Sequence, residues 1–480
     1  MTEENTIKNI LEKTPEQFRP NVSRAYEFAK EQYKGKARYN GATRISHALN
    51  VALSVASNDL DTNTVIASIL HEVPLTQSNM IVKNSSKEVL EIIKEAYSIK
   101  KATQSTDTDP QLIVKYILAS SKDLRPLFIK IYDKLDDVRS INNIPDKFIK
   151  DTLNKSLNIY SPLAEYLFLD ATKKEIEEKA FQVYLPQEYQ SITKKMEELG
   201  INTHLLNRCK GRIATSISPI FDKVSIEGRI KGTYSIYNKL KKYEKEWISP
   251  NIGSLDDLIA FRIITDTIDR CFKILEYLMD EGEIVQEGFD DYISNPKPNG
   301  YMAIQFPIKF KDITDINIEV QILTKEMDYN NKYGEASHIA YKASKTRFAK
   351  PTNKYDWVKK VQEQIQQNKL NRQKYIDLPV QCSIYEDEVF AFTPKRKIIQ
   401  LNKNDTVIDF AFRLHTTIGN SAVSALINGQ PAKLNTVINT GDIVEIKVDK
   451  NKKHQSENIL QYANSRSTKN KIIKYLQKYS

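Results

Sequence analysis

The stretch IAFRII at residues 259–264 decides the fold of the middle of this chain. A short, almost wholly apolar run is typical of a central strand that is buried on both faces. Residues 316–322 instead alternate isoleucine or valine with Asn317, Glu319 and Gln321. This period of two predicts a second strand that buries its isoleucines and carries Glu319 on a polar face. The two strands predict a mixed α/β domain.

The sequence on either side of this domain has a different pattern of apolar residues and glycines. No glycine occurs between Gly41 and Gly200, and apolar residues keep helical spacing there, which predicts a helical bundle. Residues 380–448 read as two hairpins around one helix with Thr406 as N-cap and Asp409 three residues later, as in a β-grasp module. We expect four parts, a helical domain at 1–170, a mixed α/β domain at 171–375, a β-grasp domain at 376–448 and a basic helical tail at 449–480.

The composition narrows the classes of function. The net charge is +10 over 480 residues, which favours polyanionic partners such as nucleotides, RNA or an acidic membrane surface. A lysine-rich, solvated surface explains the charge equally well. No run approaches the ~18 apolar residues of a membrane span, and the N-terminus lacks the layout of a secretory signal. We therefore expect a cytoplasmic protein without a membrane partner.

The segment GRIKGTYSIYNK at residues 228–239 concentrates phosphate-binding side chains. If its second half is helical, Ser235 and Lys239 share a face, and Arg229 and Lys231 come just before the helix. A helix N-terminus also favours anions through its dipole. A basic amphipathic helix with a solvated face is the alternative, and this segment alone favours it.

Two carboxylates accompany the predicted strands. Asp257 precedes the first strand, and Arg262 lies inside it. A buried charge needs a partner, so Asp257 is either the ion-pair partner of Arg262 or a metal ligand. Magnesium that bridges ATP phosphates typically takes one or two carboxylates, and Asp257 with Glu319 supplies two.

The loop at residues 289–301 contains two prolines and a glycine, which predicts a rigid connection. Such a loop could hold Tyr301 as a flat surface on which a base stacks. Lys297 and Asn299 could add polar contacts.

These motifs, in this order, resemble the synthetase domain of the RelA/SpoT family of long alarmone enzymes. The helical segment and the β-grasp unit resemble the HD and TGS domains of the same family, so the resemblance covers nearly the whole chain. It implies a nucleotidyltransferase-like synthetase fold in which the 3′-hydroxyl of GDP or GTP attacks the β-phosphate of ATP and releases AMP.

The resemblance also implies a role for each matching residue. ATP would be held by Arg229, Lys231, Ser235, Lys239 and Arg262. The guanine nucleotide would contact Lys297, Asn299, Tyr301 and Gln305. The catalytic residues Asp257 and Glu319 would bind Mg²⁺, and Glu319 would help to take the proton from the attacking hydroxyl.

Two departures from the family pattern concern this site. The family's Tyr-x-Ser-x-His reads YMAIQ at residues 301–305, so Gln305 replaces a histidine. Its Glu-Val-Gln-Ile-Arg-Thr reads EVQILT at residues 319–324, so Leu323 replaces an arginine. Glutamine forms hydrogen bonds but carries no charge. Weakened synthesis is one expectation, and a catalytically dead protein that binds guanine nucleotides or ribosomes is the alternative.

The helical domain carries a second set of candidate residues. Lone histidines are usually structural, but the order of these resembles the family's HD hydrolase site, which uses manganese. The matching residues are Arg38, His47, His71, Glu72 and Asp133, and all of them except Arg38 are expected on helices.

This HD-like site is degenerate. Glu72 stands where the family has an aspartate, and Leu75 and Thr76 replace an acidic pair, with Pro74 interrupting the turn. A hydrolytic water then lacks a carboxylate to orient it. We expect a scaffold without hydrolase activity, which disfavours a bifunctional synthetase and hydrolase.

One residue of the β-grasp unit also has a match. The resemblance places His415 where ribosome-bound relatives approach the acceptor end of tRNA. A surface histidine that closes a helix is the alternative.

Overall fold

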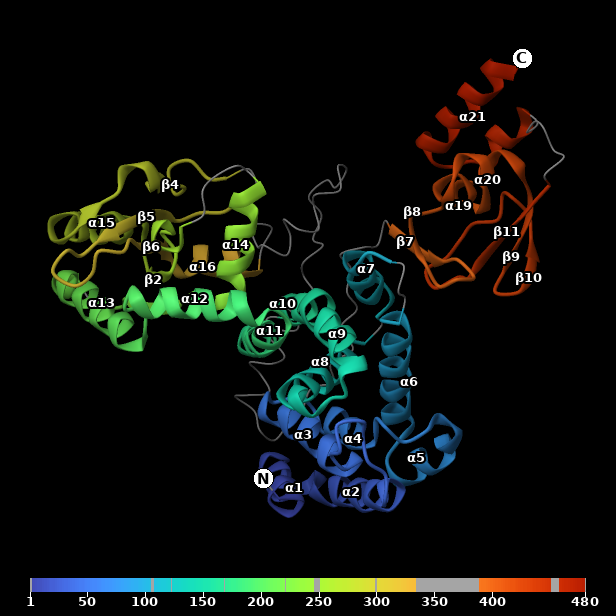
Figure 1. The fold of residues 1–480 in the computed structure, drawn as a ribbon, viewed down its shortest axis with the longest axis horizontal. Coiled ribbons are helices and arrows are strands. Elements are labelled where there is room, and N and C mark those ends of the chain that lie inside the picture. The colour runs from blue at the N-terminus through green and yellow to red at the C-terminus, as the bar shows by residue number, and fades with distance from the viewer. Residues whose placement is uncertain are drawn as a thin grey trace. The chain divides into compact units, whose positions relative to one another are not determined.

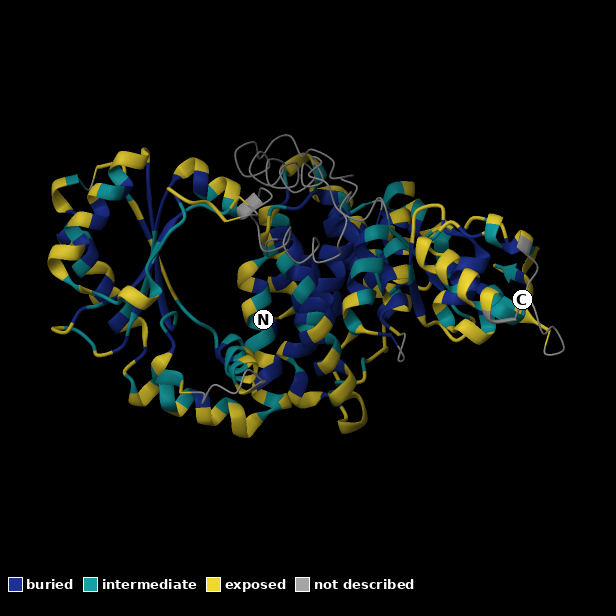
Figure 2. Ribbon diagram, turned by 90° about the horizontal axis from the view of Figure 1, so that it is seen from above, coloured by how far each residue is buried: buried dark blue, intermediate teal, exposed yellow. Residues whose placement is uncertain are grey.

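The computed structural model describes residues 2–104, 108–121, 123–167, 169–220, 222–245, 251–297, 300–333, 388–449 and 457–479 (Figure 1). The chain divides into two compact units, Met1–Phe168 with Lys359–Ser480, and Leu169–Val358. Figure 2 shows buried residues along the inner faces of the helices and along the strands, with exposed residues outside them. In the described part of the chain, no helix is both long enough and apolar enough to cross a bilayer.

The first unit begins with a helical bundle. Its helices are α1 Glu3–Lys13, α2 Arg19–Tyr33, α3 Arg44–Ser57, α4 Thr62–Leu70, α5 Ser78–Asn84, α6 Lys87–Ala102, α7 Pro110–Ser120, α8 Arg125–Arg139, α9 Asp146–Lys155 and α10 Ser161–Tyr166. Helices α3, α4, α6 and α8 pack against one another and form the centre of the bundle.

Helix α4 ends earlier than expected. Its N-cap Asp61 accepts a hydrogen bond from the Thr64 amide, but its last residue is Leu70, so His71 and Glu72 lie in the turn that follows. Their expected helical position was wrong. Pro74 limits how far the helix can extend, because helices usually end at or before the residue that precedes a proline.

The β-grasp part is confirmed as two hairpins around a helix. Its elements are β7 Glu388–Phe392, β8 Ile398–Asn402, α19 Val407–Leu414, α20 Thr416–Ser421, β9 Ala422–Ile427, β10 Gln430–Ala432, β11 Val444–Val448 and α21 Arg466–Tyr479. Thr406 and Asp409 form the expected capping box at the start of α19. The three-residue strand β10 was not expected; it follows the Asn428-Gly429 turn and pairs with β9.

The second unit is the expected mixed α/β domain. Its elements are α11 Asp170–Tyr184, α12 Pro186–Glu198, α13 Thr203–Ser216, β1 Ser225–Ile230, α14 Thr233–Lys245, β2 Ile259–Thr265, α15 Ile268–Glu281, β3 Glu283–Ile284, β4 Asp290–Asp291, β5 Ile304–Lys309, β6 Ile318–Thr324 and α16 Lys325–Tyr333. The sheet order is β1-β2-β6-β5-β3, with β4 paired to β5. Strands β2 and β6 are parallel, and the other pairs are antiparallel.

One face of this sheet forms the core of the unit. Phe261, Ile263, Val320 and Ile322 are buried on it, and α13 and α15 pack against the sheet. Gly228 permits close packing there, because a Cβ at this position would lie 2.5 Å from the Phe261 ring. The opposite face carries polar side chains over most of its area and the buried Ile264 and Leu323 at one end.

The multidomain architecture is therefore confirmed, but its limits stay predictions. The expected limit at 375/376 lies outside the described residues.

Candidate functional site

The predicted site residues that lie on strands all point to the polar face of the sheet. Arg229 pairs with Ala260, and Ala260 pairs with Glu319 across the next strand. Arg262 and Gln305 each pair with Gln321. Because paired residues in a sheet point to the same side, the side chains of all these residues share one face.

Asp257 lies in front of β2 between two lysines. Its Oδ2 is 2.6 Å from Lys231 Nζ, and its Oδ1 is 2.9 Å from Lys239 Nζ. Burial tends to raise the pKa of Asp257, but the hydrogen bonds from both lysines outweigh burial and hold the pKa below its ordinary value. Asp257 thus pairs with two of the lysines that the family resemblance assigns to ATP.

Glu319 accepts hydrogen bonds from two amides on the polar face. Gln305 Nε2 donates to Glu319 Oε1 at 2.8 Å, and Gln321 Nε2 donates to Oε2 at 3.4 Å. Burial and the charge of Asp257 raise the pKa of Glu319, while Arg229 lowers it in part. The two predicted metal ligands are therefore close enough to interact electrostatically.

Of the two alternatives for Asp257, the ion pair with Arg262 is not formed. The Arg262 guanidinium pairs with Asp328 of α16, with Nη1 and Oδ1 separated by 3.3 Å. Asp257 instead forms ion pairs with Lys231 and Lys239. Asp328 was missed because it lies far along the chain. Its position in the first turn of a helix that directly follows β6 was the available signal.

The loop before β5 positions Tyr301. A turn closes on Gly300, whose φ is +79°, and the Gly300 amide donates to the Lys297 carbonyl at 2.7 Å. The Lys297 ammonium lies 5.2 Å from the Tyr301 ring centroid and 4.1 Å from that of Tyr292, which contacts Tyr301 edge-on. Asn299 lies outside the described residues.

Two further predicted positions complete the site. Ser235 and Lys239 both lie on α14, four residues apart and half-buried, as expected. Leu323 is 1% exposed at the end of β6 and belongs to the core. A buried apolar side chain therefore stands at the end of the sheet where the family pattern has a charged one.

The HD-like residues of the helical domain converge at a separate site. One ligand atom each from His47, His71 and Asp133 lies within 4.8 Å of the others, the only such cluster of three or more among the residues described. His47 Nε2 is 3.1 Å from Asp133 Oδ1, and His71 Nε2 is buried without a hydrogen-bond partner. This donor set fits a divalent metal ion.

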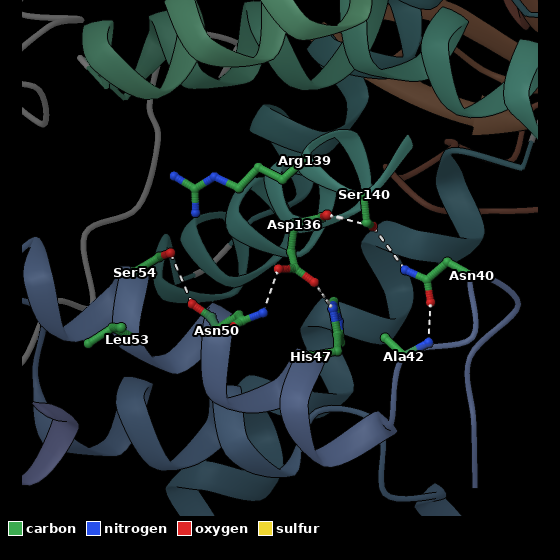
Figure 3. Close-up of a pocket in the computed structure, with 9 residues that line it drawn as sticks. All are labelled: Asn40, Ala42, His47, Asn50, Leu53, Ser54, Asp136, Arg139 and Ser140. Carbon is green, nitrogen blue, oxygen red and sulfur yellow. Dashed lines mark hydrogen bonds and ion pairs between the residues drawn. The ribbon is translucent and has the colours of Figure 1, made fainter. Parts of the chain in front are cut away.

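A second carboxylate, that of Asp136, contacts the other ring nitrogen of His47, Nδ1. Asp136 Oδ2 lies 2.7 Å from His47 Nδ1, and Asn50 Nδ2 donates to Asp136 Oδ1 at 3.0 Å; Figure 3 shows Asp136 between the two side chains. A carboxylate on the far nitrogen is how metal-binding histidines are commonly oriented. Asp136 was not among the predicted site residues, although it lies three residues after Asp133.

The remaining charges of this site are paired with one another. Arg38 approaches Glu72 at 3.7 Å and Asp137 at 3.1 Å, and it also contacts His47, while Lys130 pairs with Asp133. A cavity of about 790 Å³ opens beside His71, and Leu75 and Thr76 are among the residues that line it.

His415 of the β-grasp part has a local structural role. It ends α19 and caps α20, because its Nδ1 accepts a hydrogen bond from the Thr417 amide at 3.2 Å. The side chain is exposed, so this contact leaves its ring edge accessible.

Fold and sites together define a class of multidomain proteins that join an HD-type helical domain, a mixed α/β domain with clustered cations and carboxylates, and a β-grasp domain. Family comparisons agree with this class. Residues 25–167 match the HD domain, residues 228–346 match the region found in RelA / SpoT proteins, and residues 389–448 match the TGS domain.

Individual relatives extend the match along the chain. It is 30% identical to the guanosine-3′,5′-bis(diphosphate) 3′-pyrophosphohydrolase of Aquifex aeolicus, covering 99% of this chain and 67% of the relative. It is 29% identical to the GTP pyrophosphokinase rsh of Brucella melitensis, covering 90% of this chain and 58% of the relative. The chain belongs to the RelA/SpoT family.

A solved structure shows a weaker likeness. The small alarmone synthetase 1 from Bacillus subtilis, bound to its product pppGpp, is 19% identical and aligns with a TM-score of 0.26. The alignment covers 39% of this chain and 95% of the synthetase.

Proposed function

We propose that the protein is a GTP or GDP pyrophosphokinase that transfers pyrophosphate from ATP to the 3′-hydroxyl of GDP or GTP and forms (p)ppGpp. The observation that carries this proposal is the convergence of Lys231, Lys239 and Arg229 with Asp257 and Glu319 at one face of the sheet. The Brucella melitensis relative is named for this reaction class.

The charges of the site suit a polyanion and a divalent ion. Positioning and charge neutralisation supply most of the catalysis in phosphoryl transfer. Lys231 and Lys239 exchange Asp257 for the phosphates of ATP, and Arg229 adds a third cation. Asp257 and Glu319 together would hold Mg²⁺, which neutralises phosphate charge when it is bound. The carboxylate oxygens fit this hard cation.

Glu319 is the proposed proton acceptor. Its carboxylate lies on the polar face near the charges of Arg229, Lys231 and Lys239, where the attacking hydroxyl and the phosphates would meet. The 3′-oxygen forms a bond to the β-phosphorus, and its proton moves to Glu319. The bond between the β-phosphorus and the oxygen of the α-phosphate breaks, and AMP leaves. Tyr301 is proposed to stack on the guanine, with Lys297 and Asn299 beside it.

A labelled-substrate assay tests synthesis. The protein is incubated with Mg²⁺, GDP or GTP, and ATP labelled in its β- and γ-phosphates, and the guanosine product is separated by chromatography. Asp257→Asn should abolish product, whereas Asp269→Asn, an equal charge change at an exposed position of α15, should retain it. No product from the wild type, with or without ribosomes, would refute the proposal.

The proposed function does not include hydrolysis of (p)ppGpp by the helical domain. The Aquifex relative is named a pyrophosphohydrolase, so removal of the 3′-pyrophosphate is the direct alternative for the helical domain. Leu75 and Thr76 offer no carboxylate to a hydrolytic water, and Glu72 faces Arg38. A bound Mn²⁺ would therefore be held by His47 and its partners without turnover.

Two measurements separate metal binding from hydrolysis. With Mn²⁺ and (p)ppGpp, no pyrophosphate should be released. Calorimetry should show Mn²⁺ binding that His71→Ala removes and His204→Ala, at an exposed position of α13, retains. Pyrophosphate release that depends on His71 would contradict this assignment.

The second candidate is a catalytically inactive member of the family that binds guanine nucleotides and associates with ribosomes through the TGS domain. Gln305 and Leu323 favour it, because both positions lose a side chain that can carry charge. Binding of GDP without product formation, in the assay above, would favour this candidate.

A further inference from the structure

Gln305 was expected to contact the guanine nucleotide, but its side chain is engaged elsewhere. Its Nε2 donates to Glu319 Oε1 at 2.8 Å, within the range of a strong hydrogen bond to a charged acceptor. The Tyr301 hydroxyl lies 3.4 Å from the Gln305 Oε1. A tyrosine hydroxyl on one end of the amide and a carboxylate on the other leave one consistent orientation, with the oxygen towards Tyr301 and the nitrogen towards Glu319.

The sheet register produces this contact. Gln305 on β5 pairs with Gln321 on β6, and Glu319 lies two residues before Gln321 on the same face. Gln321 Nε2 approaches the second oxygen of Glu319 at 3.4 Å. Amides thus contact both oxygens of one carboxylate, from two neighbouring strands, and limit the rotation of the Glu319 side chain.

We propose that Gln305 is a positioning residue, which holds Glu319 in the orientation needed for pyrophosphate transfer and does not bind guanine. This inference rests on the proposed function, because Glu319 is the group that receives the proton. A neutral donor at this position is sufficient for this role, so the proposed synthesis does not require the charge of a histidine.

The two roles of Gln305 predict different kinetics. A guanine ligand contributes mainly to binding, so its loss raises KM for GDP and leaves kcat nearly unchanged. A residue that orients Glu319 acts in the transition state, so its loss lowers kcat and leaves KM for ATP and GDP nearly unchanged. Steady-state kinetics of one variant therefore separates them.

The test compares Gln305→Leu with Gln305→His in the full chain. Leucine keeps much of the volume and removes the donor, so kcat should fall about 10- to 100-fold, the loss expected for one hydrogen bond to a charged group. Histidine restores a donor and should recover most of kcat. Gln286→Leu, at an exposed position of the same domain, controls for the loss of an amide. Thermal unfolding checks that each variant is folded.

Each outcome decides a separate claim. Lower kcat for Gln305→Leu, with GDP affinity by calorimetry unchanged and recovery in Gln305→His, supports the inference. Raised KM and weakened GDP binding at unchanged kcat would overturn it, as would an unaltered kcat. Absence of product from the wild type would overturn the proposed function and this inference together.

Discussion

The two lysines on Asp257 lead to a prediction that opposes ordinary intuition about an essential carboxylate. Asp257→Asn should abolish synthesis and yet bind ATP more tightly than the wild type when no metal is present. In the wild type, the phosphates must draw Lys231 and Lys239 away from Asp257. In the variant, both ammonium groups lack this carboxylate and are available to the phosphates.

The size of the effect follows from the two ion pairs. The side chains are 20% and 18% exposed in the Lys231–Asp257 pair and 27% and 18% exposed in the Lys239–Asp257 pair. Exposed pairs contribute about 0.2–1 kcal/mol each, and this partial burial places these near the upper half of that range. Breaking both pairs therefore reduces the free energy of ATP binding to the wild type by about 1–2 kcal/mol. This corresponds to a Kd about 5- to 30-fold higher than that of Asp257→Asn.

Isothermal calorimetry with ATP in excess EDTA measures this difference. Asp269→Asn is the matched control, because it changes the net charge equally from an exposed position of α15. If Asp257→Asn binds metal-free ATP no more tightly than Asp269→Asn does, the lysines do not exchange the carboxylate for phosphate, and the reasoning fails.

Three other predictions concern packing and the HD-like site. Gly228→Ala should lower the free energy of unfolding by about 1–3 kcal/mol, because the added Cβ would meet the Phe261 ring. Gly211→Ala, whose added Cβ would lie in open space on α13, should instead raise the free energy of unfolding by up to ~1 kcal/mol. Urea unfolding of both variants measures these changes. Burial lowers the pKa of His47, but its hydrogen bonds to carboxylates outweigh burial and raise the pKa to about 9. The stability that protonated His47 contributes is therefore fully present below the unfolded pKa of about 6.5 and is lost as the pH rises through 9. NMR titration of the metal-free protein should show a pKa of about 9 for His47, and Asp136→Asn should reduce it. Mn²⁺ should broaden the ring signals of His47 before those of exposed histidines, and uniform broadening would argue against the site.

The sequence pattern predicted the two central strands of the α/β domain, β2 and β6, for a physical reason. A strand with one buried face must alternate, so residues 318–322 revealed both the strand and the polar position of Glu319. The face of Gln305 is set by the same alternation. Its contact with Glu319 also depends on the register between β5 and β6, which alternation within one strand leaves open.

Long-range ion pairs were harder to foresee. Asp257 meets lysines 18 and 26 residues away, and Arg262 meets Asp328 from the helix that follows β6. The position of Asp328 just after β6 was the one local signal, but any carboxylate brought to that face could compensate Arg262. The convergence of His47 with Asp133 likewise depends on how α3 packs against α8.

The stoichiometry of AMP formation tests the central claim most directly. With ATP, GDP and Mg²⁺, quantitative chromatography should find one AMP for each guanosine tetraphosphate formed, because the β- and γ-phosphates leave ATP together. Asp257→Asn should form neither product. AMP without a guanosine product, ADP as the main product, or no turnover by the wild type would contradict pyrophosphate transfer at this face of the sheet.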